Sequence, residues 1–168
     1  MSDEGTFDAV IIGAGPAGIS AGIWCRDLGL TAVVLEREPE PGGQLLSIHN
    51  PITNYPGLRT ENGRKMRDCF METAASYGLD IRLSSEVVEV NTDRKLVITA
   101  SGERFHARAI IVATGVRRRK LNIPGETELQ GKGIIESGSR DKEQVRGKTV
   151  AIIGGGDAGG AARDGVRG

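Results

Sequence analysis

The stretch Val10-Ile11-Ile12-Gly13-Ala14-Gly15-Pro16-Ala17-Gly18 decides the fold of this chain. An apolar run changes within a few positions into Gly-x-Gly-x-x-Gly, which predicts a buried parallel strand, a tight turn and the start of a helix. The first glycine makes the turn, the second lets the backbone approach a pyrophosphate, and the third lets helix and sheet pack closely. The N–H groups and dipole of that helix then favour phosphate charge.

The surroundings of this stretch support a dinucleotide site. Strands are expected over 7–12 and 31–35, with a helix over 19–28 between them. Glu36 follows the second strand, 23 residues after Gly13. That spacing is close to the roughly 20 residues expected for an acid that binds a ribose. A strand, turn and helix with a purely structural role is the alternative.

Composition bounds the class of protein. A chain of 168 residues, 38% apolar and 26% charged, is typical of one globular domain or slightly more. No apolar run approaches the roughly 18 residues of a membrane span, and the N-terminus is acidic, unlike a signal peptide. We therefore expect a cytoplasmic protein with no membrane partner.

Charge is unevenly distributed although the net charge is zero. The acidic side chains are concentrated in residues 1–93 and the basic ones in 94–168, with the densest run at 117–120. That run is either a solvated linker or a contact for a phosphate or an acidic protein. Because only 4% of residues are aromatic, few rings could stack on bases, and nucleic acid is the weakest hypothesis.

The cysteines and histidines predict neither a disulfide nor a metal site. Cys25 and Cys69 lie 44 residues apart in two predicted helices, which favours buried, reduced thiols. His49 and His106 have no cysteine or histidine neighbours with the spacing of metal ligands.

The middle of the chain changes from helical to strand periodicity. Prolines and glycines predict irregular structure over 37–45 and a structured loop over 48–59, followed by a helix over 61–77. Short strands are expected at 81–83, 86–90, 96–99 and 104–106, the last three as an antiparallel meander inserted into an α/β domain. A central parallel strand over 109–113 would end at Thr114-Gly115, and an irregular connection would follow over 123–133.

Residues 149–159 repeat the opening pattern. A second apolar run enters Gly-x-Gly-x-x-Gly at Gly154, which predicts a second buried strand and dinucleotide turn. Residues 160–168 have the composition of a poor helix, and no second ribose acid follows. This second site is therefore expected to be incomplete.

With both patterns placed, the chain resembles the low-molecular-weight thioredoxin reductases and their ferredoxin–NADP reductase relatives. The resemblance covers about residues 7–158. It rests on the ordered motifs Gly-Ala-Gly-Pro-Ala-Gly at 13–18, Glu36, Gly-Gly-Gln-Leu at 42–45, Asn-Tyr-Pro-Gly at 54–57, Ala-Thr-Gly at 113–115, Ile-Pro-Gly-Glu at 123–126 and Gly-Gly-Gly-Asp-Ala at 154–158.

The resemblance implies a Rossmann-like FAD-binding domain over 1–122, a connection over 123–147 and the start of an NAD(P)-binding Rossmann domain over 148–168. FAD would lie along the first turn and NAD(P)H at the second. The residues implied for FAD are Gly13, Gly15, Pro16, Ala17, Gly18, Glu36, Gly43, Gln44, Leu45, Asn54, Val87, Ala113, Thr114 and Gly115; those for NAD(P)H are Gly154, Gly156 and Ala158.

Two departures from the family pattern qualify these expectations. Ser137-Gly138-Ser139-Arg140 stands where thioredoxin reductases carry Cys-x-x-Cys, so disulfide exchange with thioredoxin is not supported. The segments that would complete both domains are absent, so we expect a C-terminally truncated product that is incomplete for turnover.

Three functions stay open from the sequence. The first is an NAD(P)H-dependent FAD oxidoreductase without a redox dithiol, homodimeric, with an acidic carrier such as ferredoxin as partner. No catalytic acid or base needs to be named for it, since the flavin carries the redox chemistry. The second is a non-catalytic FAD-binding module or partner subunit. The third is a basic binding protein on a Rossmann scaffold.

Overall fold

The computed structural model describes residues 3–117, 119–135 and 141–154, which divide into two compact units, 1–117 and 118–168. The elements of the first unit are β1 (Asp3–Ile12), α1 (Pro16–Asp27), β2 (Ala32–Leu35), the 3₁₀ helix η1 (Gly43–Ser47), β3 (Ile52–Tyr55), β4 (Leu58–Thr60), α2 (Gly63–Ser76), β5 (Asp80–Arg82), β6 (Val87–Asn91), β7 (Leu96–Thr99) and β8 (Arg104–Val112). Those of the second are α3 (Glu126–Leu129) and the 3₁₀ helix η2 (Lys142–Val145). No described helix is long and apolar enough to cross a membrane.

The first unit is built on one mixed sheet with the strand order β5-β2-β1-β8-β7-β6. Strands β5, β2, β1 and β8 run parallel, while β7 pairs antiparallel with β8 and β6 pairs antiparallel with β7. Because the parallel strands all end at the same edge, the segments after Ile12, Leu35, Arg82 and Val112 emerge together there. This is the edge at which open α/β sheets bind ligands.

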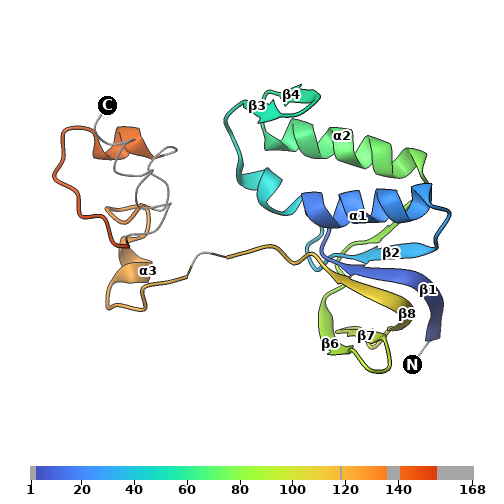
Figure 1. Ribbon diagram of the computed structural model, residues 1–168. Helices are drawn as coiled ribbons and strands as arrows, with labels where there is room; N and C mark the ends of the chain where they lie inside the picture. The colour runs from blue at the N-terminus through green and yellow to red at the C-terminus, as the bar shows by residue number, and fades with distance from the viewer. Residues whose placement is uncertain (1–2, 118, 136–140, 155–168) are drawn as a thin grey trace. The chain divides into compact units, whose positions relative to one another are not determined.

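Two apolar clusters hold this sheet. On one face α1 and α2 lie side by side (Figure 1), and Ile19 and Ala74 pack against Ile11 and Val34. On the other face Val10, Val33 and Leu35 pack with Val97 and Phe105 from β7 and β8. The Arg82 guanidinium of β5 lies 5.2 Å from the Phe105 ring centre of β8, on the same face. The first strand is therefore buried from both sides, as its apolar run predicts.

The helix predictions are confirmed, with shifted ends. α1 begins at Pro16, whose fixed φ and missing N–H suit a first helical position. α2 begins after Asn62, whose side-chain Oδ1 accepts a hydrogen bond of 3.0 Å from the Lys65 N–H. Such N-caps satisfy an otherwise unpaired donor of the first turn.

Three local predictions were wrong. The segment expected to be a loop over 48–59 contains the hairpin β3–β4, because Pro56 and Gly57 (φ +78°) suit the two central positions of a tight turn. Irregular structure over 37–45 gives way at Gly43 to η1. The strands expected at 104–106 and 109–113 form one strand, β8, since no turn residue separates them. The expected antiparallel meander is confirmed as β6, β7 and β8, and β8 also pairs with β1 in the same sheet.

The second unit differs from its prediction in two places. The connection over 123–133 is not wholly irregular, because Gly125 (φ +85°) precedes the short helix α3. The strand expected at 149–153 is not formed: these residues are exposed, with Ile153 at 67%. In the described part of the chain no strand pairs with this segment, so an apolar run alone does not become a buried strand. The expected boundaries at 122 and 147 stay predictions.

Candidate functional site

The candidate site lies at the carboxyl edge of the parallel strands, around the turn that follows β1. Gly13 has φ +104°, and a Cβ there would lie 2.6 Å from the Ala113 carbonyl oxygen. A Cβ on Gly18 would overlap the Gly13 carbonyl oxygen. Only glycine fits either position, because the turn and the start of α1 press against the segment that leaves β8.

Gly15 differs from its two neighbours in the pattern. No atom lies within 4 Å of the place its Cβ would take, and its φ of −78° is open to any residue. Gly15 is the N-cap of α1, so the N–H groups of Ala17 and Gly18 belong to a first turn without partners inside the helix. The structure thus leaves free space and donors in front of Gly15, as an approaching anion requires.

Glu36 is buried, with 8% of its surface exposed, and lies directly beside the turn. Its Oε2 accepts a hydrogen bond of 2.7 Å from the Ala14 N–H, and its Oε1 accepts one of 3.0 Å from the Glu38 N–H. A carboxylate has about four acceptor positions. Glu36 therefore has acceptor capacity left for a diol placed next to the glycine turn.

The loop after Glu36 closes on the same turn. The Gly42 N–H donates to the Ala14 carbonyl at 2.7 Å, and a Cβ on Gly43 would lie 3.1 Å from the Gly15 Cα. The Gln44 side-chain amide donates to the Val116 carbonyl at 2.9 Å, which joins this loop to the segment after Thr114. Leu45 of the same loop is buried. The space in front of Gly15 is thus bordered by four segments that are distant in sequence: the turn 13–18, Glu36, the loop 42–45 and residues 113–116.

Sequence reasoning does not single out Ala14 and Gly42 as functional. Their peptide groups hold the arrangement: the Ala14 N–H is bound by Glu36 and its carbonyl by Gly42. The available signal is that each stands beside a glycine of a recognised motif.

Val87 and Asn54 lie farther from the turn. Val87 begins β6 and packs into the second apolar cluster; two residues earlier, the Ser85 N–H donates to the Glu36 carbonyl at 2.7 Å. Asn54 is exposed on the β3–β4 hairpin. The hairpin packs on α2, with the Tyr55 and Phe70 rings 5.9 Å apart.

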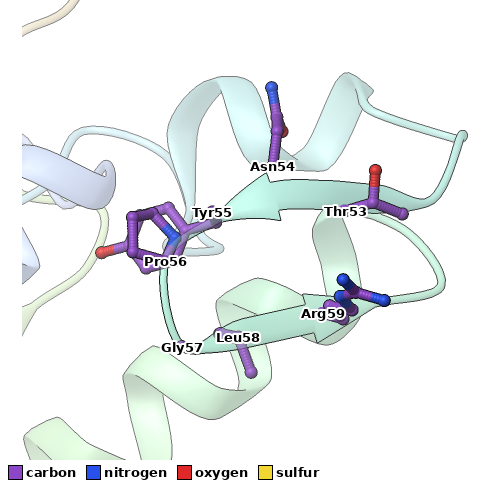
Figure 2. Close-up of a pocket in the computed structure, with 7 residues that line it drawn as sticks. All are labelled: Thr53, Asn54, Tyr55, Pro56, Gly57, Leu58 and Arg59. Carbon is purple, nitrogen blue, oxygen red and sulfur yellow. The ribbon is translucent and has the colours of Figure 1, made fainter.

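A pocket of about 490 Å³ lies on this hairpin, not at the glycine turn. Figure 2 shows its lining, which follows both short strands and the Pro56–Gly57 turn. Consecutive residues 53–59 form the whole lining, so this pocket is a hollow of the hairpin itself. The space before Gly15 fits a dinucleotide better, since it joins a helix N-terminus to a buried carboxylate.

The second glycine pattern does not form a comparable site. Gly154 has φ +109°, yet no atom lies within 4 Å of the place its Cβ would take, and residues 149–153 are exposed. Gly156 and Ala158 lie outside the described residues, as does the segment 137–140. The part of this pattern that the structure describes does not fit a nicotinamide dinucleotide.

The cysteines carry no disulfide. Both are free; Cys25 is buried and Cys69 is half-buried, so the expectation of buried thiols is met fully only by Cys25. Burial raises the pKa of the Cys25 thiol, which lowers the amount of reactive thiolate.

Comparison with known proteins gives a consistent family. The model of a family described as pyridine nucleotide-disulphide oxidoreductase matches residues 7–160. Among curated proteins, the thioredoxin reductase of Bacillus subtilis is 32% identical over 99% of this chain and 51% of its own length. The bifunctional thioredoxin reductase/thioredoxin of Mycobacterium leprae is 37% identical over 92% of this chain and 34% of its own.

Solved structures agree with these matches. The crystal structure of T. acidophilum thioredoxin reductase superposes with a TM-score of 0.70 at 31% identity, covering 96% of this chain and 52% of the other. That of Lactococcus lactis thioredoxin reductase gives 0.68 at 34% identity, covering 83% and 46%. The chain spans about half the length of most of these relatives.

Proposed function

Because this chain belongs to the pyridine nucleotide-disulphide oxidoreductase family, we propose that residues 3–117 bind the FAD of a thioredoxin reductase-like oxidoreductase. The mixed α/β sheet is the Rossmann-like fold of the thioredoxin reductase structures. FAD and NADPH are the cofactors of this family and of thioredoxin reductases. The single observation that carries the assignment is the open space before Gly15, set between two glycines that tolerate no side chain.

Each segment around that space has a proposed part in binding. Gly13, Pro16 and Gly18 shape the turn, while Gly15 and Ala17 face the pyrophosphate with backbone N–H groups. Glu36 accepts hydrogen bonds from the ribose hydroxyls with the acceptor capacity left by Ala14 and Glu38. The remaining proposed contacts are Gly43, Gln44 and Leu45 on one side, Ala113, Thr114 and Gly115 on the other, the Val87 backbone towards the adenine and Asn54 towards the flavin.

The redox step belongs to the cofactor. When bound, FAD supplies a centre that accepts two electrons from a nicotinamide and passes them to an acceptor. The protein supplies binding and orientation, and no side chain is assigned as acid or base. We place no nicotinamide step at Gly154, Gly156 and Ala158, because the described part of that pattern does not fit the group.

The acceptor proposed is a small redox carrier protein. One relative, 35% identical over 94% of this chain, is described as a 34.2 kDa protein in the rubredoxin operon of Clostridium pasteurianum, and others are thioredoxin reductases. An acidic carrier such as ferredoxin would suit the exposed Arg117, Arg119 and Lys120. We also propose that electrons pass to the acceptor without a redox dithiol. The protein is further proposed to be a homodimer and to be located in the cytoplasm.

A second candidate function is a non-catalytic FAD-binding module or partner subunit. It is favoured by the exposed residues 149–153, which form no strand beside Gly154. In that case FAD would bind, but NADPH would not reduce it.

The test combines flavin uptake with reduction. The purified chain is mixed with FAD, passed through a desalting column and examined by visible absorption. Retained FAD with a structured flavin band supports the proposal, and a colourless protein contradicts it. NADPH is then added without oxygen: fast bleaching of the flavin supports the oxidoreductase, and slow or no bleaching supports the module.

A further inference from the structure

Glu40 joins the loop after β2 to the helix α2. Its Oε1 accepts hydrogen bonds of 2.7 Å from the Nη1 atoms of both Arg64 and Arg67, one helical turn apart. Arg67 first, and then Arg64, lowers the pKa of the Glu40 carboxyl below its ordinary value. The Glu40 carboxyl is therefore ionised at neutral pH.

The two arginines differ in what else they contact. The Arg64 side chain is 54% exposed, whereas that of Arg67 is 16% exposed. Arg67 also donates from Nη1 to the Pro41 carbonyl at 3.4 Å and from Nε to Asp68 Oδ1 at 2.7 Å. Its aliphatic part lies against Gly42, where an added Cβ would be 2.7 Å from the Arg67 Cγ.

The backbone that Arg67 contacts leads directly to the glycine turn. Gly42 has φ +124° and binds the Ala14 carbonyl, and Gly43 has φ +51° and packs on Gly15. Two successive positive φ angles have many alternatives in a free chain, so something must select this one. The contacts of Arg67 to Glu40 and Pro41 lie immediately before this pair of glycines, and its contact to Gly42 lies within the pair.

We propose that Arg67 is a positioning residue of the dinucleotide site, which holds the glycine loop 42–44 against the turn at Ala14 and Gly15. This inference rests on the proposed function, because the site concerned is the FAD site. Without Arg67 the loop populates other conformations, and the apparent FAD affinity is multiplied by the fraction of chains that keep the competent conformation.

An exposed ion pair would not have this effect, since such pairs contribute little. Arg64 supplies the matched control: it binds the same carboxylate oxygen from the same helix at the same distance, but no contact to Pro41 or Gly42 is present in the described structure. A difference between variants at the two positions isolates the contact with the loop.

The experiment compares the full chain with Arg67→Ala, Arg67→Lys and Arg64→Ala. FAD dissociation constants are measured by flavin fluorescence, and exchange of the Gly42 amide hydrogen is measured without FAD. We expect Arg67→Ala to weaken FAD binding about tenfold, the size of one lost charge-assisted hydrogen bond. Arg67→Lys restores part of the affinity, because it keeps the charge opposite Glu40 but cannot make all of the contacts. Arg64→Ala stays within about twofold of wild type.

The Gly42 amide provides a readout that a general loss of stability would not produce. Its exchange should accelerate in Arg67→Ala and not in Arg64→Ala, while amides of β1 keep their protection in both. Equal FAD affinities of the two alanine variants would overturn the inference. If Arg67→Ala does not fold by circular dichroism, Arg67→Lys decides in its place, and an affinity equal to that of Arg64→Ala overturns the inference.

Failure of the proposed function is distinguishable. Wild-type protein that takes up no FAD contradicts the FAD site itself and, with it, a role of Arg67 in binding. Wild-type protein that binds FAD while Arg67→Ala binds equally well contradicts only the positioning role.

Discussion

The two glycine patterns of this chain are alike in sequence and different in structure. Gly13 and Gly154 both follow a pair of isoleucines, and their φ angles are nearly equal, +104° and +109°. Yet Ile11 is fully buried while Ile152 is 42% exposed. The local backbone preference is therefore the same in both regions, and the surroundings make the difference.

The first pattern has neighbours that the second lacks in the described part of the chain. β1 pairs with β2 on one side and β8 on the other, and α1 and α2 cover one face. Residues 149–153 have no strand partner there. A glycine turn becomes a binding site only when other segments close the space around it, as those at Glu36, Gly43 and Ala113 do for the first turn.

The largest expected difference concerns the isoleucines two positions before each turn. Ile11→Ala should lower the free energy of unfolding by about 3 kcal/mol, because it removes a fully buried side chain from a packed cluster. Ile152→Ala should change it by less than about 0.5 kcal/mol, since much of that side chain is in solvent. Urea unfolding followed by circular dichroism measures both. Equal losses of unfolding free energy would show that residues 149–153 are packed, and would contradict the comparison.

The next effect concerns the first glycine of each pattern. Alanine at either position is strained by the positive φ. Only Gly13→Ala also brings a Cβ to 2.6 Å from a backbone oxygen, that of Ala113. We expect Gly13→Ala to cost about 2 kcal/mol more than Gly154→Ala, the usual size of overpacking. The fluorescence of Trp24, the only tryptophan, can follow unfolding of the first unit. A smaller cost for Gly13→Ala than for Gly154→Ala would contradict the tight contact at the first turn.

The smallest effect lies at the opposite edge of the sheet. The Asp8 carboxylate accepts hydrogen bonds from the Thr31 N–H and hydroxyl and from Arg108, and these contacts lower its pKa, the Thr31 N–H most. A lowered folded-state pKa stabilises the fold above about pH 4, and this stabilisation is lost as the pH falls through the folded-state value. Asp8→Asn should therefore flatten the acid side of a stability–pH curve for the first unit. An unchanged acid side would contradict the assignment.

The sequence predicted most of what surrounds the first turn, because those features are local. An apolar run, three glycines and an acid at a set spacing identify β1, α1 and Glu36 before any packing is known. The composition of 48–59 predicts a loop, whereas the turn geometry of Pro56-Gly57 indicates the β3–β4 hairpin that the structure contains.

Features that depend on distant residues could not be predicted in this way. Hydrophobicity predicts that residues 149–153 are buried, but burial needs partners that a single segment does not reveal. The contact between Arg67 and Gly42 joins residues 25 positions apart, and no periodicity in the sequence predicts it. The two hydrogen bonds by which Glu36 and Gly42 hold the Ala14 peptide are likewise visible only in three dimensions.

The affinity of the chain for FAD, measured with alanine at either end of α1, tests the central claim most directly. At both Gly15 and Gly29 the place that an added Cβ would take is open, with nothing within 4 Å of it. Gly15→Ala should weaken FAD binding about tenfold or more, because its Cβ enters the space assigned to the pyrophosphate. Gly29→Ala should leave the dissociation constant unchanged. Unaltered FAD binding in Gly15→Ala, or the same loss in both variants, would contradict a site at the first turn.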